Sequence, residues 1–287
     1  MTMTGRGAEL RRRTVLGAAL LAASGCASAT KADPVAFRQT RHTTAVDGVR
    51  IAWRDSGPAG APAILLCNGG GQAMAVWDGI VAPLLDTRRV LLHDRRGTGD
   101  SEPGAPESHT FETFRDDAFA VMDAAGVDKA VVCGLAFGSR VAVRMALDQP
   151  ARLEGLVLFD ATGAMPAPEA ERIAGAEEAE RLRTAAGIGT PARDPAWNAM
   201  TYSEGRGLNA RALRGQPDWI DGLLSIHMPT LIAVGEQDPN IVGGRRMAQE
   251  IPGARFVALP MTGHGSNVQR PDLLTALLQE FLGGLDR

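Results

Sequence analysis

Short, almost continuously apolar runs alternate along the chain with longer segments in which apolar residues return every three or four positions. Runs of four to eight apolar residues are typical of strands buried on both faces, and the longer amphipathic segments are typical of helices. The apolar runs lie at 63–67, 89–93, 131–134, 153–159, 229–235 and 254–259, and the helical patterns at 73–85, 110–125, 137–149, 243–250 and 271–282. This alternation requires parallel pairing with right-handed crossovers, so we predict an α/β fold with a doubly wound, mostly parallel sheet.

Two segments depart from the alternation. Residues 35–53 read as a β-hairpin with a turn at Asp47 and Gly48. Residues 162–222 are rich in Ala, Glu, Arg and Pro and carry no strand pattern. We expect this stretch to be a helical cap, inserted into one domain that extends over 34–287.

The first 33 residues are typical of an export signal rather than of a folded segment. Arg11 to Arg13 precede a short Ala/Leu/Gly run and then small residues. Twin arginines followed by apolar residues resemble the twin-arginine route. Two processing sites fit: a lipobox ending at Cys26, which would lipidate and anchor the protein, or peptidase cleavage after Ala29. Both predict a periplasmic or cell-envelope location, with membrane contact only through this segment.

Charge and composition exclude several other classes of partner. The net charge is −3 and the pI is about 6.0, and no basic stripe lies in the folded part, so we expect no nucleic-acid partner. The chain has no HExxH-type pair and no phosphate-binding loop after a first strand. We therefore expect a small-molecule substrate, with no metal and no cofactor.

Residues 134–138, Gly-Leu-Ala-Phe-Gly, lie between a β-branched apolar run and a helical pattern. The spacing is that of the nucleophile elbow, Gly-x-Ser-x-Gly, a sharp strand-to-helix turn that presents its central residue at the top of a parallel sheet. Here the central residue is Ala136. A methyl group cannot attack a carbonyl, so the turn is predicted without its nucleophile.

Two later loops carry polar residues at the carboxyl ends of strands, where parallel sheets bind ligands. Glu236 to Pro239 follow the strand that ends at Gly235, and they include Asp238. Met261 to Gly265 follow the last strand, and they include His264. The chain order is therefore elbow, acid, histidine.

Two more motifs follow the first two apolar runs: Asn68-Gly69-Gly70-Gly71 and Asp94-x-Arg96-Gly97-x-Gly99-x-Ser101. With the elbow, the acid and the histidine, they make residues 35–285 resemble the α/β-hydrolase superfamily. The resemblance implies that His264 is a general base and that Asp238 orients it. It also implies that the backbone N–H groups of Phe137 and Gly70 (or Gly69) form an oxyanion hole. The resemblance further implies that the substrate carries an acyl group and that the reaction needs no cofactor.

The pocket around this site is predicted from the loops and the cap. We expect Asn68 and Gly69 from the glycine loop and Met165 and Trp197 from the insertion to line it, unless the apolar residues of the insertion form a small core of their own. Asn68 stands where the superfamily usually has histidine. Asp160, after the strand that ends at Phe159, is an alternative position for the acid.

Ala136 leaves three hypotheses. The chain is an ester, amide or lactone hydrolase whose serine has been replaced, so that the acyl-enzyme route is disabled. Alternatively, the pair of His264 and Asp238 acts as a general base without a covalent intermediate, in a cyclase, lyase, isomerase or direct hydrolase. In the third hypothesis, the chain binds a ligand and catalyses nothing. Because the acid, the histidine and the glycines are all retained, the sequence favours a hydrolase lineage over a ligand-binding protein. Among the three hypotheses it favours the first, a site altered at one position.

Overall fold

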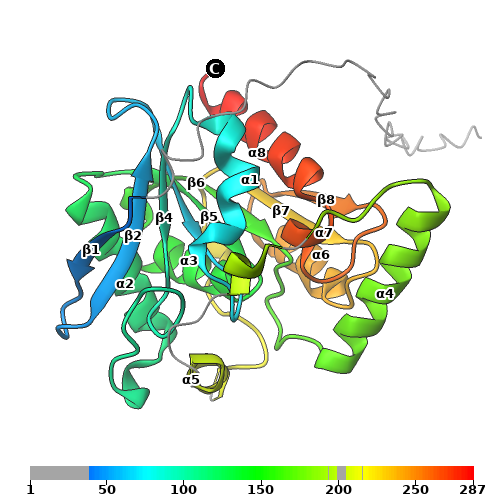
Figure 1. The fold of residues 1–287 in the computed structure, drawn as a ribbon, viewed down its shortest axis with the longest axis horizontal. Coiled ribbons are helices and arrows are strands. Elements are labelled where there is room, and N and C mark those ends of the chain that lie inside the picture. The colour runs from blue at the N-terminus through cyan, green and yellow to red at the C-terminus, as the bar shows by residue number, and fades with distance from the viewer. Residues whose placement is uncertain (1–38, 193, 199–204, 215) are drawn as a thin grey trace, which may run out of the picture. The chain divides into compact units, whose positions relative to one another are not determined.

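The computed structural model describes residues 39–192, 194–198, 205–214 and 216–287 (Figure 1). The chain divides into two compact units, Met1–Ala32 and Asp33–Arg287, and all described residues belong to the second. The export signal predicted at 1–33 therefore lies outside the described residues and stays a prediction. Among the helices that the structure describes, none is long and apolar enough to cross a membrane.

In the described part of the chain, eight strands form one mixed sheet in the order β1-β2-β4-β3-β5-β6-β7-β8. The strands are β1 (Arg41–Thr44), β2 (Arg50–Ser56), β3 (Ala63–Cys67), β4 (Arg89–His93), β5 (Ala130–Leu135), β6 (Leu153–Phe159), β7 (Thr230–Gly235) and β8 (Arg255–Leu259). The β1–β2 and β2–β4 pairs are antiparallel, and every pair from β4 to β8 is parallel. The predicted α/β fold with a mostly parallel sheet is confirmed.

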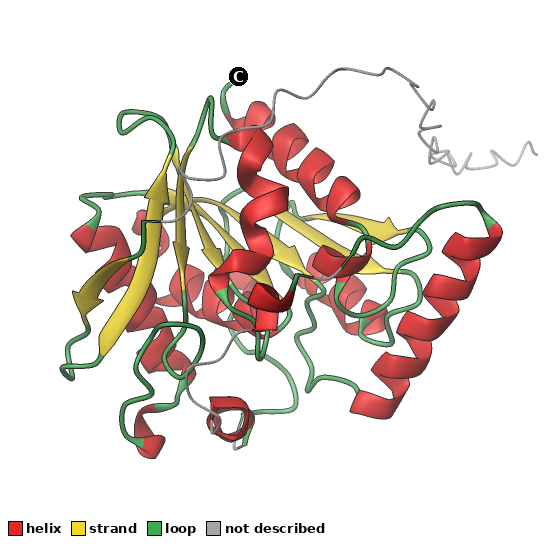
Figure 2. Ribbon diagram, in the orientation of Figure 1, coloured by secondary structure: helices red, strands yellow, loops and turns green. Residues whose placement is uncertain are grey.

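Helices cover both faces of this sheet (Figures 1 and 2). One face packs against α2 (Phe111–Ala124), α3 (Phe137–Asp148) and α6 (Ile241–Glu250), and the other against α1 (Asp78–Val81) and α8 (Pro271–Leu285). All five residues of β3 are buried, which explains why its sequence is a continuous apolar run.

The helix predicted over 73–85 is wrong as a single element. The segment instead forms three short turns: η1 (Met74–Trp77), α1 and η2 (Ala82–Leu84). Pro83 has no backbone N–H and cannot donate to residue 79, and Gly79 disfavours a helix interior. The apolar positions still face the core, with Trp77, Ile80 and Val81 buried, because successive helical turns keep nearly the same periodicity.

The insertion between β6 and β7 contains α4 (Glu169–Ala185), η5 (Pro195–Asn198), α5 (Gly205–Leu213) and η6 (Leu223–Ser225). Glycines let α4 approach two loops at the carboxyl edge of the sheet. A methyl added at Gly175 would lie 2.0 Å from the carbonyl oxygen of Gln237, and one at Gly263 would lie 2.6 Å from the Cα of Ala176. The loops that follow β7 and β8 are therefore packed directly against the insertion.

Candidate functional site

The turn between β5 and α3 has the geometry of a nucleophile elbow. Ala136 has φ 49° and ψ −107°, a strained conformation for a residue with a side chain. Gly134 and Gly138 are required by close approach: a methyl at Gly134 would lie 2.5 Å from the carbonyl oxygen of Gly138, and one at Gly138 would lie 2.2 Å from that of Cys67. The backbone thus presents residue 136 at the carboxyl edge of the sheet, although the side chain is only a methyl.

Ser139 does not replace the missing nucleophile. Its hydroxyl donates to the carbonyl oxygens of Gly134, at 2.9 Å, and Phe159, at 3.0 Å, and the residue is 2% exposed. These bonds hold the hydroxyl inside the elbow, between β5, β6 and α3, where it stabilises the turn.

The structure brings His264 and Asp238 together. Nδ1 of His264 lies 2.8 Å from Oδ2 of Asp238, whose side chain is fully buried, while the imidazole is 17% exposed. The other carboxylate oxygen, Oδ1, accepts the N–H of Asn240 at 2.9 Å. Because Nδ1 is engaged with the carboxylate, Nε2 is the ring nitrogen left for a substrate.

Asp160 adds a second carboxylate beside the histidine. It is 1% exposed, and its Oδ2 accepts the N–H groups of Gly265, at 2.9 Å, and Ser266, at 2.8 Å. It therefore fixes the loop that carries the imidazole, while the hydrogen bond to Nδ1 comes from Asp238. Asp160 also has a left-handed backbone, with φ 50°, directly after β6.

The two carboxylates set the pKa of the imidazole. Burial lowers the pKa of His264, but the hydrogen bond to Asp238 and the charge of Asp160 outweigh burial, so the pKa lies above its ordinary value of 6.5. Burial also raises the pKa of Asp160 to about 6, against the opposing charge of His264. Protonation of either group therefore affects the other.

Asp160, Asp238 and His264 also offer three potential metal-ligand atoms within 4.8 Å of one another. One oxygen of each carboxylate orients the histidine or its loop: Asp238 Oδ2 lies 2.8 Å from Nδ1, and Asp160 Oδ2 accepts two backbone N–H groups. This arrangement is that of an oriented general base.

Phe137 and Gly70 line the same cavity as His264 and carry backbone N–H donors. Phe137 is the first residue of α3, where N–H groups have no acceptor within the helix. The glycine loop approaches the same place, since a methyl at Gly70 would lie 3.7 Å from Cβ of Phe137. Two N–H groups at this position can bind an oxygen that becomes negative during a reaction.

These groups line one cavity of about 430 Å³. Its size suits a small organic substrate. Its wall is made by residues from the glycine loop, the elbow, the insertion and the histidine loop: Gly69, Gly70, Gly71, Gln72, Leu135, Ala136, Phe137, Arg140, Asp160, Thr162, Pro166, Glu169, Arg172, Ala210, Leu213, Asn240, His264 and Gly265.

Three residues predicted for the pocket are not among the described residues that line it. Asn68 is buried beneath it, where its amide donates to the carbonyl oxygen of His93 at 3.0 Å and accepts Nε1–H of Trp77 at 2.8 Å. Met165 is 40% exposed, and Trp197 packs against the core on the side of α1 and α8. Asn68 is therefore a structural residue, because its polar groups are already used to join β3 to its neighbours.

Sequence reasoning missed the residues that join the insertion to the site. Asn240 accepts the N–H of Ala167 at 2.8 Å and lies 3.3 Å from Nδ1 of His264. Arg183 of α4 donates to Gln269 at 3.0 Å, and Gln269 donates to the carbonyl oxygen of His264 at 2.7 Å. Polar residues on an otherwise ordinary helix and loop gave no signal, because their partners are distant in sequence.

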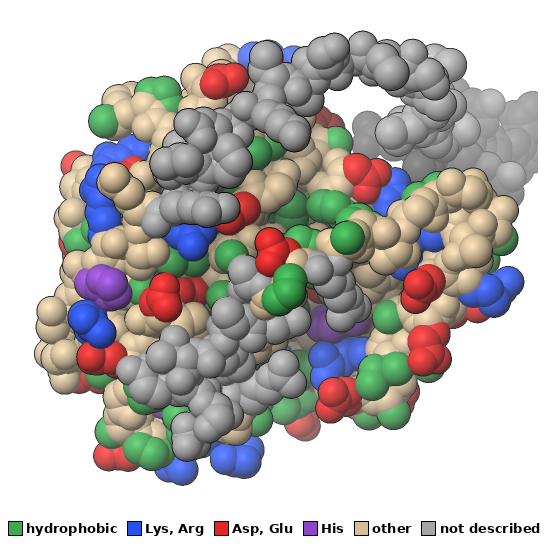
Figure 3. All heavy atoms as spheres, in the orientation of Figure 1, with side chains coloured by type: hydrophobic (Ala, Val, Ile, Leu, Met, Phe, Trp, Pro, Cys, Tyr) green, Lys and Arg blue, Asp and Glu red, His purple; other side chains and the backbone are tan. Residues whose placement is uncertain are grey.

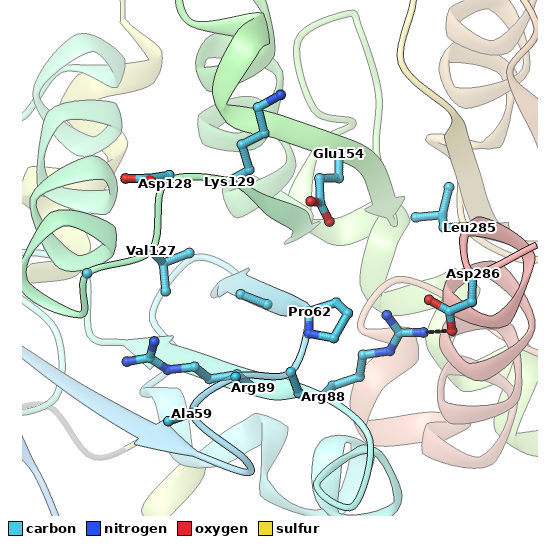
Figure 4. Close-up of a pocket in the computed structure, with 14 residues that line it drawn as sticks. Ala59, Pro62, Arg88, Arg89, Val127, Asp128, Lys129, Glu154, Leu285 and Asp286 are labelled. Carbon is cyan, nitrogen blue, oxygen red and sulfur yellow. Dashed lines mark hydrogen bonds and ion pairs between the residues drawn. The ribbon is translucent and has the colours of Figure 1, made fainter.

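A second hollow of about 570 Å³ lies at the opposite end of the strands (Figure 4). It is larger, but its arginines already have partners. Arg88 pairs with Asp286, and Arg89 donates to Asp55 at 2.8 and 3.0 Å. Parallel sheets bind ligands at the carboxyl ends of their strands, so the smaller cavity is the candidate site.

On the face drawn in Figure 3, acidic and basic side chains of the described residues are interspersed, without a continuous basic surface there. This agrees with the slightly negative net charge.

Comparison with known proteins identifies the family. A family model described as alpha/beta hydrolase fold matches residues 62–194. The chain is 28% identical over 243 residues to a putative carbamate hydrolase, RutD, of Caulobacter sp. (strain K31), covering 77% of this chain and 90% of that protein. It is 27% identical over 253 residues to 3-oxoadipate enol-lactonase 1 of Acinetobacter baylyi, covering 82% and 94%.

A solved structure agrees over almost its whole length. The crystal structure of a hydrolase from Pseudomonas aeruginosa PA01 matches with a TM-score of 0.71 and 31% identity, covering 86% of this chain and 99% of that one. The fold, the order of the motifs and these similarities lead to one conclusion: the chain belongs to the α/β-hydrolase superfamily.

Proposed function

We propose that this chain hydrolyses a small ester, lactone or carbamate without forming an acyl-enzyme, with His264 as general base and Asp238 as its orienting acid. One observation carries the proposal: an imidazole whose Nδ1 lies 2.8 Å from a buried carboxylate shares a cavity with the strained elbow at Ala136 and with Gly70. Known relatives include proteins named as a carbamate hydrolase and an enol-lactonase, which supports this range of substrates.

The covalent route of the superfamily needs a hydroxyl at position 136. Alanine leaves the space of that hydroxyl free, in the cavity that His264 also lines. A water molecule bound there would transfer a proton to Nε2 of His264 while its oxygen attacks the carbonyl carbon. The N–H groups of Phe137 and Gly70 would stabilise the oxyanion, and the imidazolium would return the proton to the leaving group.

The strained elbow supports a role beyond holding a nucleophile. A backbone such as that of Ala136 is unfavourable by about 1–3 kcal/mol and requires support from its surroundings. Phe137, the next residue, lines the cavity and is the first residue of α3, where its N–H has no acceptor within the helix. Oxyanion binding therefore gives the elbow a function that does not depend on a serine.

The route is expected to be slower than covalent catalysis. A positioned general base contributes about 10²–10⁴ in rate, and one oxyanion donor contributes about 10²–10³. Removal of a triad serine, by comparison, lowers turnover by about 10⁶. Strained or activated carbonyl substrates are therefore the ones that we expect the chain to hydrolyse.

Rapid mixing with p-nitrophenyl acetate, together with intact-protein mass measurement, tests the absence of an acyl-enzyme. We expect turnover without a burst of nitrophenol and without an acetyl adduct. A stoichiometric burst with an adduct that disappears during turnover would contradict the proposal. No hydrolysis of this ester or of a set of γ- and δ-lactones would contradict it as well.

We also propose that the folded domain acts outside the cytoplasm, on the basis of Arg11 to Arg13 and the small residues around Cys26. Fractionation of cells that produce the chain tests this. We expect it in the envelope fraction, and Lys in place of Arg11, Arg12 and Arg13 should retain it inside. An unchanged distribution would contradict twin-arginine export.

A further inference from the structure

Two arginines line the cavity beside the elbow and the histidine. Arg140 belongs to α3 and is 6% exposed, and its guanidinium donates to the carbonyl oxygen of Ala164. Arg172 belongs to α4 and is partly buried, and its Nε donates to the carbonyl oxygen of Ala167 at 3.1 Å. Each guanidinium has five N–H donors, so one backbone carbonyl leaves most of them available.

Neither guanidinium lies within ion-pair distance of a carboxylate in the part of the chain that the structure describes. Burial lowers the pKa of Arg140, and no charge among the described residues opposes this effect. Arg96 shows the usual arrangement: it is fully buried and contacts Asp117 and Asp47 at 2.6–2.7 Å. A buried guanidinium without an anion is unfavourable, so Arg140 is a site to which an external anion can bind.

The position of Arg140 relates this anion to the reacting carbon. Arg140 lies in the first turn of α3, which begins directly after Ala136, and both residues line the same cavity. Arg172 approaches from the insertion, close enough for its charge to lower the pKa of His264. Asp160 and Glu169 are the carboxylates among the described residues of this wall.

We propose that Arg140 and Arg172 bind a carboxylate of the substrate, so that the compound hydrolysed is a short acyl compound with a carboxylate a few bonds from the scissile carbonyl. The inference rests on the proposed function, because it assigns the reacting carbonyl to the space beside Ala136. Guanidinium groups suit this role, since their planar N–H pairs match the two oxygens of a carboxylate.

Calorimetric titration of the full chain with glutarate tests the subsite apart from turnover. Glutarate resembles a product acid with a second carboxylate, while butyrate and glutaramide have a similar length and lack one or both charges. We expect glutarate to bind at least about tenfold more tightly than either compound, because hydrogen bonds between charged groups are the strong ones. Equal affinity of the three compounds would overturn the inference.

Variants locate the contact. Arg140→Met and Arg172→Met should each weaken glutarate binding by about tenfold or more and leave butyrate binding much less affected. Arg181→Met is the matched control: Arg181 is also on α4, but it is exposed, pairs with Glu178 and does not line the cavity. If Arg140→Met fails to fold, Arg140→Lys can be used, because it keeps the positive charge without the planar guanidinium. This variant should lose part of the preference for glutarate over butyrate.

The outcomes also separate this inference from the proposed function. Hydrolysis of a neutral ester that needs His264, without any preference for glutarate, would contradict the carboxylate subsite alone. Glutarate binding that needs Arg140, in a chain that hydrolyses nothing, would support the subsite and contradict the proposed function.

Discussion

Nδ1 of His264 lies 2.8 Å from Oδ2 of Asp238, and the two residues come from loops that follow neighbouring strands, β8 and β7. The bond fixes the tautomer in which Nε2 is free to accept a proton. A second carboxylate, Asp160, holds the histidine loop through two backbone N–H groups. The base is thus fully oriented in a chain that lacks the nucleophile such a base usually activates.

The first prediction concerns pH. A general base must be neutral, so activity should fall as the pH decreases through the pKa of His264, which is raised above 6.5. Asp160→Asn keeps an acceptor for the N–H groups of Gly265 and Ser266 but removes the charge that helps to raise this pKa. The acidic limb of the kcat/KM profile should therefore move to lower pH. Glu178→Gln, at an exposed position on α4, is the control and should not move it. A shift of the limb to higher pH with Asp160→Asn would contradict this assignment.

The second prediction restores the nucleophile. Ala136→Ser places a hydroxyl on the elbow next to the imidazole, so hydrolysis of short aryl esters should rise by several orders of magnitude. A fluorophosphonate probe should label this variant. It should not label the unaltered chain, because the hydroxyl of Ser139 is held by Gly134 and Phe159. Absence of both labelling and gain in Ala136→Ser would show that His264 does not face position 136.

The third prediction concerns stability. Arg96 is fully buried and donates to both oxygens of Asp117 at 2.7 Å, and Asp117 is 1% exposed. Arg96→Met leaves this carboxylate buried without its partner, so the free energy of unfolding should fall by about 3–5 kcal/mol. Urea denaturation measures the change. Arg181→Met removes an exposed pair and should show no measurable effect; an equally small effect for Arg96→Met would contradict the structural role of this ion pair.

The fourth prediction tests how α4 is seated on the acid loop. A methyl at Gly175 would lie 2.0 Å from the carbonyl oxygen of Gln237, the residue before Asp238. Alanine is normally more favourable than glycine inside a helix, by about 1 kcal/mol. At position 175 the close contact should outweigh this gain, so Gly175→Ala should lower the free energy of unfolding by about 1–3 kcal/mol and should also lower kcat. Gly189→Ala, where a methyl meets nothing within 4 Å, should change neither. A more stable Gly175→Ala variant would contradict the close approach of α4.

The sequence predicted the elements whose local pattern decides their structure. The elbow follows from its glycines, since Gly138 must approach the carbonyl of Cys67 without a side chain. The strands follow from continuous apolar runs, as in β3. The single helix predicted over residues 73–85 was wrong because apolar periodicity shows which residues are buried. It does not show where Pro83 interrupts the helical hydrogen bonds.

The parts of the site that escaped prediction depend on contacts between distant segments. Asn68 looked like a pocket residue, but His93 and Trp77 already satisfy its amide. Nothing in the sequence singled out Arg140. The structure shows that it is buried, bonded to the carbonyl oxygen of Ala164 in the insertion and not paired with a carboxylate among the described residues. Local sequence carries no record of such partners, so the charge balance of the cavity becomes visible only in three dimensions.

Hydrolysis by His264→Ala, compared with the unaltered chain, tests the central claim most directly. If His264 is the general base, kcat/KM for p-nitrophenyl acetate should fall by about 10²–10⁴, while His227→Ala, at an exposed histidine, should leave it unchanged. Activity retained by His264→Ala would contradict catalysis by the pair of His264 and Asp238.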